Sequence, residues 1–204
     1  MKIYDCFIFY DEELLLEIRL NCLDKFVDKF VIVESKYSHR GQKRNPVFNI
    51  SKYQKFKDKI IYILLENEPD NLSEIYNNDK QINEKIILNG NLREFYQRNA
   101  ISKGLNEAGD NDIIIVSDVD EIPILDQINF KEIKRSPIFF NQIFCCYKFN
   151  LYSSLKWYGS RLIKKKYLKS PQWLRDIKDR NYPKWRLDTY FSKKKTNNIQ
   201  FIEN

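Results

Sequence analysis

Short apolar runs recur along the first half of the chain, and each is long enough for a buried β-strand. They cover residues 3–9, 29–34, 59–64 and 113–117. Runs that are apolar on both faces are typical of parallel strands, because helices cover both sides of such a sheet. The pattern therefore predicts an α/β fold.

A helical pattern separates the first two predicted strands. Acidic residues at 11–13 favour a helix start, since negative charge is stabilised near a helix N-terminus. The apolar positions that follow at roughly helical spacing are Leu14, Leu15, Ile18 and Leu23. A strand, a helix and a strand in succession predict a βαβ unit with parallel strands.

The remaining segments predict less regular elements. Residues 51–57 favour a short helix, and residues 66–91 are rich in Asn and Asp, with a helix expected in their middle. The clearest helix covers residues 92–108 and ends at Gly109, a residue type that suits a helix C-cap. The aromatic residue types between 138 and 152 favour a strand.

Composition supports one folded domain over residues 1–204. Of the 204 residues, 43% are hydrophobic and 15% are aromatic, which is enough for a sizeable core. The sequence contains no low-complexity tract, internal repeat or linker that would separate two domains.

Charge is distributed unevenly around a net value of +7. Residues 1–130 carry 17 Lys and Arg against 23 Asp and Glu, whereas residues 131–204 carry 18 against 5, a net of +13. This basic C-terminal third would favour an anionic partner such as a nucleotide diphosphate, an acidic lipid surface or nucleic acid. A solvated surface is the alternative, and from Trp157 onward the pattern assigns no regular element.

Cysteine and histidine usage argues against a zinc site. The chain has one histidine, His39, and no C-x-x-C pair among its four cysteines, which are Cys6, Cys22, Cys145 and Cys146. We expect the cysteines to be buried thiols in a reducing compartment. The N-terminus lacks an apolar signal-peptide core, and no stretch reaches the roughly 20 apolar residues of a membrane span. We therefore expect a cytoplasmic protein without a transmembrane segment, and peripheral membrane contact is left open.

The most informative motif is Asp118-Val119-Asp120, which follows the apolar run at 113–117. Alternate residues of a strand point the same way, so both carboxylates project together if the extended backbone continues past Ser117. In open α/β sheets, ligands bind at the carboxyl ends of the strands. Neighbouring carboxylates raise each other's pKa unless a cation lies between them. A bound Mg²⁺ or Mn²⁺ ion would play that part and would leave coordination positions free for the oxygens of a diphosphate. The motif therefore predicts a metal site for a nucleotide-activated substrate, with an Asp-rich turn as the alternative.

Other polar residues lie where a nucleotide could bind. Glu34 and Ser35 end the second predicted strand, from which side chains can reach a base or a ribose. Arg93 and Arg98 lie on the helix before the Asp motif but share no helical face. One of them could reach a phosphate or Asp118, because arginine forms charge-assisted bonds with such oxygens. Alternatively, Glu34 and Ser35 only cap the end of the strand, and Arg93 and Arg98 are ordinary surface residues.

Four segments in a fixed order carry a family resemblance. They are Tyr4-Asp5-Cys6-Phe7-Ile8-Phe9, Leu15-Leu16-Glu17-Ile18-Arg19-Leu20, Val27-Asp28-Lys29-Phe30-Val31-Ile32-Val33-Glu34-Ser35 and Ser117-Asp118-Val119-Asp120-Glu121-Ile122-Pro123. Together they resemble glycosyltransferase family 17, which includes β-1,4-mannosyl-glycoprotein β-1,4-N-acetylglucosaminyltransferases. The resemblance runs from residue 3 to about residue 125, and more loosely to the C-terminus.

This resemblance implies a GT-A-type fold that binds a nucleotide sugar, with a mixed, mostly parallel sheet flanked by helices. Residues 1–125 would form the nucleotide-sugar-binding half and residues 126–204 the acceptor-side half. The resemblance also implies that Asp118 and Asp120 form a DxD motif that holds Mn²⁺ or Mg²⁺. UDP-N-acetylglucosamine would be the donor, and its sugar would pass with inversion to a glycan hydroxyl. Typical members continue past the point where this chain stops, so a C-terminal truncation is left open.

An inverting transferase needs a base for the acceptor hydroxyl and a cleft for the acceptor sugar. Glu121 is the candidate catalytic residue; Asp188 is a second candidate base, and a supporting role for Glu121 is an alternative. Tyr147, Asn150 and Trp157 are the candidate acceptor-binding residues, since sugars stack on aromatic rings and amides bind hydroxyl groups. The same aromatic residues could instead belong to the core.

Two other classes of function stay open on the sequence alone. The basic third could make the chain a non-catalytic binder of an anionic surface or of nucleic acid, although it carries no RNA-binding or zinc-finger signature. The Asp motif would also suit a phosphoryl-transfer or hydrolytic enzyme, but there is no Walker glycine loop or H-E-x-x-H. Five glycines without a G-x-G-x-x-G fingerprint disfavour a dinucleotide enzyme. We therefore expect a metal-dependent transferase with a UDP-sugar donor and a glycan acceptor, and no nucleic acid as partner.

Overall fold

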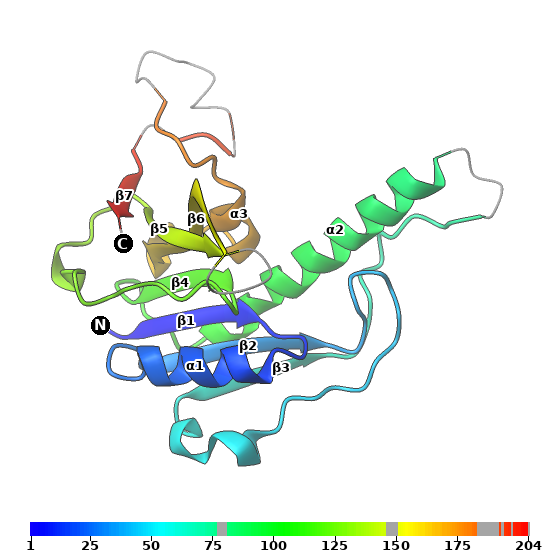
Figure 1. The fold of residues 1–204 in the computed structure, drawn as a ribbon, viewed down its shortest axis with the longest axis horizontal. Coiled ribbons are helices and arrows are strands. Elements are labelled where there is room, and N and C mark those ends of the chain that lie inside the picture. Colours follow the sequence, from blue (N-terminus) through cyan, green and yellow to red (C-terminus); the bar gives the residue numbers. More distant parts are fainter. Residues whose placement is uncertain (77–80, 146–150, 183–191, 193, 197, 204) are drawn as a thin grey trace.

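A seven-stranded sheet runs through the computed structural model, which describes residues 1–76, 81–145, 151–182, 192, 194–196 and 198–203 (Figure 1). The strand order is β3-β2-β1-β4-β6-β5-β7. The strands are β1 (Ile3–Ile8), β2 (Lys29–Ser35), β3 (Ile60–Leu65), β4 (Ile113–Asp118), β5 (Ile138–Cys145), β6 (Tyr152–Lys164) and β7 (Gln200–Glu203).

The first four strands are parallel, whereas β6 runs antiparallel to both of its neighbours, and β7 is parallel to β5. The predicted α/β fold with a mixed, mostly parallel sheet is confirmed. Both proposed halves of the chain contribute to this sheet, since β1 to β4 precede residue 125 and β5 to β7 follow it. The division into a donor half and an acceptor half stays a prediction.

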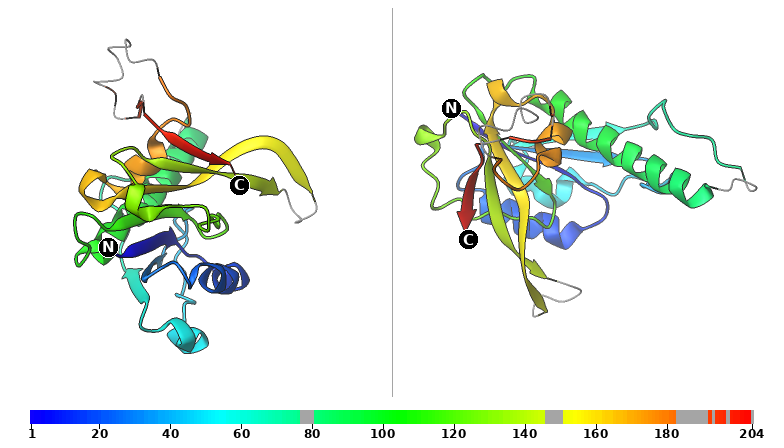
Figure 2. Two further views of the ribbon diagram at one scale, coloured as in Figure 1. Left: turned by 90° about the vertical axis from the view of Figure 1, so that its left-hand side faces the viewer. Right: turned by 90° about the horizontal axis from the view of Figure 1, so that it is seen from above.

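Helices cover both faces of the sheet (Figure 2). One face packs against α1 (Glu13–Leu23) and the 3-10 helix η1 (Ile50–Phe56). The other face packs against α2 (Ile82–Ala100), the 3-10 helix η2 (Ile101–Leu105) and α3 (Pro171–Asp176). Two short 3-10 helices complete the elements, η3 (Phe130–Glu132) and η4 (Lys165–Tyr167). The amino-terminal half of α2 projects away from the sheet, as Figure 1 shows.

Alternate residues of the central strands serve the two cores. In β4, Ile113 and Ile115 pack on the α1 side, and Ile114 packs on the α2 side. The same alternation places Ser117 on the α1 side and Asp118 on the α2 side. Elements on the α1 side can therefore contact the end of β4 at Ser117, and elements on the α2 side can contact it at Asp118.

The buried face of α1 differs from the expected one. Leu14 is 67% exposed and Ile18 is 37% exposed, and of the four expected positions only Leu23 is fully buried. The residues that face the sheet are Leu16, Arg19, Leu20 and Leu23. Apolar residues surround this helix almost evenly, so their spacing does not select a face. The inward position of a charged residue, Arg19, decides the orientation instead.

Two further elements correct the sequence prediction. The helix expected over 92–108 starts earlier, because α2 begins at Ile82, and its last turns tighten into η2 rather than ending at Gly109. Gly109 donates its N–H to Asp112 Oδ2 at 2.8 Å and is not a left-handed C-cap. The chain from Trp157 onward, to which no element was assigned, contains the end of β6, a strand of 13 residues, followed by η4, α3 and β7. β5 and β6 extend beyond the other strands as a two-stranded ribbon (Figure 2).

The cysteines only partly follow the expectation of buried thiols. Cys6 is buried, Cys22 is exposed and Cys145 is half-buried; Cys6 and Cys22 are free thiols. Cys146 lies outside the described residues. Among the helices that the structure describes, none is long and apolar enough to cross a membrane.

Gly104 lies where η2 packs closely against the sheet, so a substitution there tests that packing. A Cβ at Gly104 would lie 2.5 Å from Val31 Cγ1 and 3.2 Å from Ile63 Cδ1. We expect Gly104→Ala to lower the free energy of unfolding by about 1–3 kcal/mol, which is typical of an overpacked core. Urea denaturation measures the change. At Gly109 the nearest heavy atom to a new Cβ is 3.7 Å away, so Gly109→Ala should change stability by less than about 0.5 kcal/mol. Equal losses at both positions would contradict the packing described for η2.

Candidate active site

The backbone turns as soon as β4 ends. The N–H of Glu121 donates to the carbonyl of Asp118 at 3.1 Å, and the N–H of Ile122 donates to the carbonyl of Asp120 at 3.2 Å. The extended backbone that was expected past Ser117 therefore stops at Asp118, and that premise is wrong. Asp118 and Asp120 nevertheless line the same cavity, so the turn brings together the side chains that a longer strand was expected to align.

Arg19 of α1 holds this turn from the α1 side of the sheet. Its guanidinium and the Asp5 carboxylate form two bonds of 2.7 Å, and both side chains are fully buried. The same guanidinium donates to the hydroxyl of Ser117. Its Nη1 donates to three carbonyls of the turn, those of Asp118 at 3.0 Å, Val119 at 3.2 Å and Glu121 at 2.9 Å. One buried cation thus joins β1, β4 and the turn that carries the Asp motif.

Two arginines bind Asp118 from the opposite side. Arg98 of α2 donates to Asp118 Oδ1 at 3.0 Å, and Arg175 of α3 donates to Asp118 Oδ2 at 2.9 Å. Arg98 is itself held by Glu94 at 2.7 Å and by Gln172 at 2.8 Å, and its Nε is buried without a hydrogen-bond partner among the described residues. Arg98 therefore reaches Asp118, one of the two contacts considered from the sequence. Its contact with a donor stays a prediction.

Glu121 is enclosed by donors rather than open to a substrate. Its carboxylate accepts hydrogen bonds from the N–H of Asp118 at 2.8 Å, from Trp157 Nε1 at 3.0 Å and from Arg175 at 2.7 Å and 3.1 Å. The residue is 7% exposed. The close approach of β6 depends on Gly159, since a Cβ there would lie 2.5 Å from Glu121 Cδ. This geometry favours a positioning role for Glu121 over that of a general base, which needs an open lone pair.

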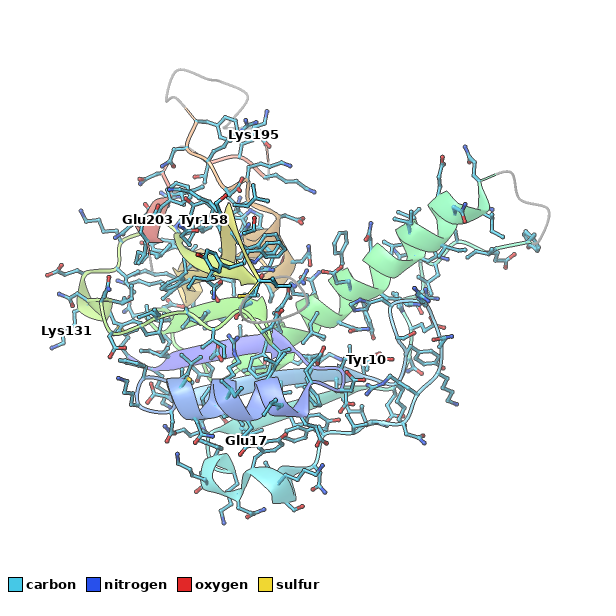
Figure 3. The ribbon with its side chains drawn as sticks, in the orientation of Figure 1. Tyr10, Glu17, Lys131, Tyr158, Lys195 and Glu203 are labelled. Carbon is cyan, nitrogen blue, oxygen red and sulfur yellow. The ribbon has the colours of Figure 1, made fainter. Side chains whose placement is uncertain are left out.

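The cavity beside the Asp motif has a volume of about 710 Å³. Its walls come from the end of β1, the start of α1, the turn after β4, the carboxyl-terminal half of α2 and the loop after β2. The polar residues on these walls are Tyr10, Glu12, Ser38, His39, Arg40, Gln42, Glu94, Gln97, Arg98, Asp118 and Asp120. Tyr10 marks this region in Figure 3, where the loops after β1 and β2 approach α2. The volume lies in the range of small-molecule and cofactor sites.

Arg93 supports the loop that forms one cavity wall. It donates to Glu68 Oε1 at 2.5 Å and to the carbonyl of His39 at 3.3 Å. Gly41 adopts a positive φ of 83°, and a Cβ there would lie 2.5 Å from Arg93 Nη2, so the turn requires glycine. Gln97, one turn along α2, contacts His39 Nε2 at 3.2 Å. Arg93 thus lies behind the loop, and its proposed donor contact is untested.

Glu34 and Ser35 are likewise engaged by the protein itself. Glu34 is fully buried and accepts hydrogen bonds from Arg44 at 2.9 Å and from Tyr62 at 2.8 Å. Two backbone N–H groups, at residues 47 and 48, complete its contacts at 2.8 Å and 3.1 Å. Ser35 accepts from the N–H of Tyr37 at 3.0 Å. Both residues shape the loop after β2, and their direct contact with a donor stays a prediction.

Of the candidate acceptor residues, Trp157 lies beside the site. It is 44% exposed, stacks on Phe144 with ring centroids 5.2 Å apart, and donates its indole N–H to Glu121. Tyr147 and Asn150 lie outside the described residues, as does Asp188.

The surroundings shift the pKa values of the two aspartates in opposite directions. Burial alone would raise the pKa of Asp118, but the guanidinium groups of Arg175 and Arg98 outweigh it and hold the pKa below its ordinary value. Burial, followed by the negative charges of Glu121 and Asp118, raises the pKa of Asp120. No ion pair between Asp120 and a described side chain compensates its charge.

These charges bear on whether a divalent cation fits. The described residues contain no group of three or more His, Cys, Asp or Glu side chains arranged to hold a metal ion. Mg²⁺ and Mn²⁺ need fewer, because protein sites often supply one or two carboxylates and leave the other positions to water and substrate phosphates. An uncompensated carboxylate at Asp120, on the same wall as Asp118, fits that chemistry.

Several of these side chains could not be selected from sequence patterns. Arg19 and Arg175 were not candidates, because a charged residue on a helix is usually solvated and because α3 lies in a segment without a clear pattern. His39 and Arg40 were hidden in a polar loop. The one available signal there was Gly41, since a glycine in a polar loop can mark a turn with positive φ.

The buried pair of Arg19 and Asp5 can be tested by removing one charge. Arg19→Met leaves the Asp5 carboxylate unpaired and three carbonyls without a donor, so we expect a loss of about 3–5 kcal/mol in the free energy of unfolding. Asp5→Leu combined with Arg19→Met should lose less, because no buried charge is left alone. As a control, Lys52→Met breaks the exposed pair with Glu13 and should cost less than about 1 kcal/mol. A small loss for Arg19→Met in urea denaturation would contradict the central role of this pair.

The opposite pKa shifts predict opposite effects of pH on stability. Because the folded protein raises the pKa of Asp120, ionisation of Asp120 costs stability above that pKa, and the cost disappears below the ordinary value of 3.8. Asp120→Asn should therefore raise the melting temperature at about pH 7, and the gain should shrink as the pH falls. Asp118→Asn should lower the melting temperature at about pH 7, since a depressed pKa stabilises the ionised form. Thermal melts across the pH range measure both; a destabilised Asp120→Asn at neutral pH would contradict the assignment.

Comparison with known proteins agrees with this arrangement. Residues 1–154 match the family described as glycosyltransferase family 17. Two relatives named beta-1,4-mannosyl-glycoprotein 4-beta-N-acetylglucosaminyltransferase, from Homo sapiens and Rattus norvegicus, are each 26% identical over 120 residues. The aligned region is 57% of this chain but only 21% of the human relative and 20% of the rat relative. The match covers most of the chain, including β1 to β5 and the Asp motif, so the family resemblance is confirmed: the chain belongs to glycosyltransferase family 17 and is related to an N-acetylglucosaminyltransferase.

Proposed function

We propose that this glycosyltransferase has a GT-A-type fold and transfers N-acetylglucosamine from UDP-N-acetylglucosamine to a glycan hydroxyl with inversion, using a divalent metal ion. The observation that carries the proposal is the position of Asp118 and Asp120 on one cavity wall at the carboxyl end of β4. Ligands of open α/β sheets bind at that edge. The relatedness to an N-acetylglucosaminyltransferase supports the choice of donor sugar.

Asp120 and Asp118 are the residues that would hold Mn²⁺ or Mg²⁺. A bound cation would supply positive charge to the departing diphosphate. Asp120 presents an exposed carboxylate to the cavity, whereas both Asp118 oxygens already bind arginines. Asp120 is therefore the stronger candidate ligand, and Asp118 fixes the direction of the turn that carries it.

The cavity also offers groups that suit the donor. Arg40 is exposed on the wall and forms no ion pair with a described carboxylate, so its guanidinium is available to a phosphate. Tyr10 exposes 42% of its surface on the same wall, and the guanidinium of Arg44 lies 4.1 Å from its ring centroid. A ring supported in this way can stack on a nucleotide base. Arg40, Arg98 and Tyr10 would thus hold the diphosphate and the base.

On the acceptor side, Trp157 is the candidate platform for a sugar ring. Its hydrogen bond to Glu121 fixes the edge of the indole, and 44% of the residue remains exposed. Glu121 would orient Trp157 and Arg175 together, which makes it a positioning residue. The base that accepts the hydroxyl proton is not assigned among the described residues. The alternative of a non-catalytic binding protein is not favoured, because the family is one of transferases.

The test of this proposal is metal-dependent donor binding. We expect UDP-N-acetylglucosamine to bind in the presence of MnCl₂ and to lose most of its affinity in EDTA, as measured by isothermal titration calorimetry. Asp120→Ala should abolish the metal-dependent part of the affinity while the protein stays folded by circular dichroism. Asp126→Ala is the matched control, since it removes an exposed acid that pairs with Lys25 away from the cavity.

Two outcomes would contradict the proposal. The first is equal UDP-sugar binding by wild type and Asp120→Ala in MnCl₂. The second is release of UDP at the same rate with and without an acceptor glycan, because this would indicate hydrolysis rather than transfer.

A further inference from the structure

A second cavity, of about 630 Å³, lies apart from the cleft that contains the Asp motif. It lies near the other end of β4, where the N–H of Lys166 donates to the carbonyl of Asp110 at 3.1 Å. Its walls include the segment before β5, the residues around η4, one side of α3 and the described residues between 192 and 198. Figure 3 labels Lys195 of this cavity and Tyr10 of the cleft, which lie well apart. We call the second cavity the basic cavity.

The described residues that line the basic cavity carry positive charge without negative charge. Arg135, Lys166, Lys169 and Lys195 line it, and no Asp or Glu is among the described lining residues. Several surface lysines of this chain have a carboxylate partner; for example, Lys25, Lys52 and Lys55 each form an ion pair with an acid. Arg135, Lys166 and Lys169 form none within the described part of the chain, and Lys166 donates instead to the neutral Asn111 Oδ1 at 2.9 Å. The local field therefore favours an anion.

Aromatic rings position these cations. Lys166 Nζ lies 5.4 Å and Arg135 Cζ lies 5.8 Å from the ring centroid of Tyr167, and Lys169 Nζ lies 5.2 Å from that of Trp173. Cation–π contacts orient a cation without neutralising it, so the charge stays available to a ligand. Both rings also line the basic cavity. A wall of this kind offers a flat apolar face together with charge-assisted donors.

The size and the chemistry of the basic cavity indicate the class of ligand. A volume of about 630 Å³ suits a small organic molecule rather than a single inorganic ion. Aromatic rings suit the C–H face of a sugar, and lysine and arginine suit a phosphate or carboxylate on it. A single-stranded nucleic acid would be expected to follow a longer groove with successive stacking platforms, and the described cations instead gather around one cavity.

We infer that the basic cavity binds an anionic saccharide, meaning a sugar that carries a phosphate or a carboxylate. This site is distinct from the proposed donor and acceptor cleft, and it does not depend on the proposed transferase reaction. The helix α3 connects the two regions, because Trp173 lines the basic cavity and Arg175, two residues later, binds Asp118. A ligand in the basic cavity would lie on the side of α3 away from the Asp motif.

Direct binding tests the inference. We would titrate wild-type protein, without donor or metal, with glucose 6-phosphate, trigalacturonate, inorganic phosphate and neutral maltotriose by calorimetry at two salt concentrations. We expect at least one of the two anionic saccharides to bind more tightly than inorganic phosphate and maltotriose, with an affinity that falls as salt rises. The better of the two identifies the anionic group. Arg135→Gln, Lys166→Gln and Lys169→Gln combined should weaken binding at least about tenfold, as expected when three cations leave one anion.

The matched control removes the same charge elsewhere. Lys25→Gln, Lys52→Gln and Lys55→Gln combined also lower the net charge by three, and these lysines already pair with acids around α1 and η1. This variant should retain wild-type affinity. Tyr167→Leu should weaken binding of the saccharide but not of inorganic phosphate.

Four results would overturn the inference. They are no binding of either anionic saccharide, an equal loss in both triple variants, inorganic phosphate binding as tightly as the better saccharide, and tighter binding of a single-stranded oligonucleotide than of any saccharide. Because Asp120→Ala leaves the basic cavity intact, failure of donor binding and failure of saccharide binding are separate results.

Discussion

The buried guanidinium of Arg19 is the interaction on which the candidate active site depends. A charge that is fully removed from water is costly unless every polar group around it is matched. Here one carboxylate, one hydroxyl and three backbone carbonyls surround it, from β1, from β4 and from the turn beyond β4. These carbonyls belong to the segment that presents Asp118 and Asp120, and such groups rarely stay buried without a donor. Arg19, which is buried on the α1 side of the sheet, therefore fixes the position of the turn that carries Asp118 and Asp120.

The other face of the sheet completes this arrangement with residues from a later part of the chain. Arg175 binds both Asp118 and Glu121 and lies on α3, beyond the 154 residues that match the family. Arg161 of β6 in turn donates to the carbonyls of residues 174 and 177, at 2.9 Å and 2.7 Å, which holds the end of α3 against the sheet. The motif thus depends on the family-matched residues 1–154 for its strand and for Arg98, and on the C-terminal third for Arg175. Some arginines of the basic C-terminal third therefore stabilise the site from within the protein, and the net charge of the segment does not distinguish them from surface residues.

The sequence predicted β1 to β4 well because each is a continuous apolar run, and it assigned no element to β7 or to β6 from Trp157 onward. It predicted the site less well for two physical reasons. Asp118 and Asp120 converge through a turn rather than along a strand, and a turn of this kind depends on donors such as Arg19 that are distant in sequence. Glu34 and Arg93 looked available to a ligand because their partners come from loops, which no local pattern indicates. The residues that proved hardest to predict are charged side chains such as Arg19, whose partners lie 14 to 102 positions away.

The pKa values of Asp118 and Asp120 shift in opposite directions, which indicates different roles for the two residues. Asp118 is ionised favourably, since two arginines compensate it, and the fold alone accounts for its charge. The surroundings of Asp120 disfavour its ionised form: Arg19 offsets part of the effect from a distance, but no described side chain forms an ion pair with Asp120. Acids whose pKa is raised in this way concentrate at functional sites, and Asp120 also lines the cavity beside Asp118. A cation that binds only the folded protein would reverse this cost, because ligand binding adds its own free energy to stability. The physical argument for a metal therefore depends on Asp120 more than on the presence of two aspartates in sequence.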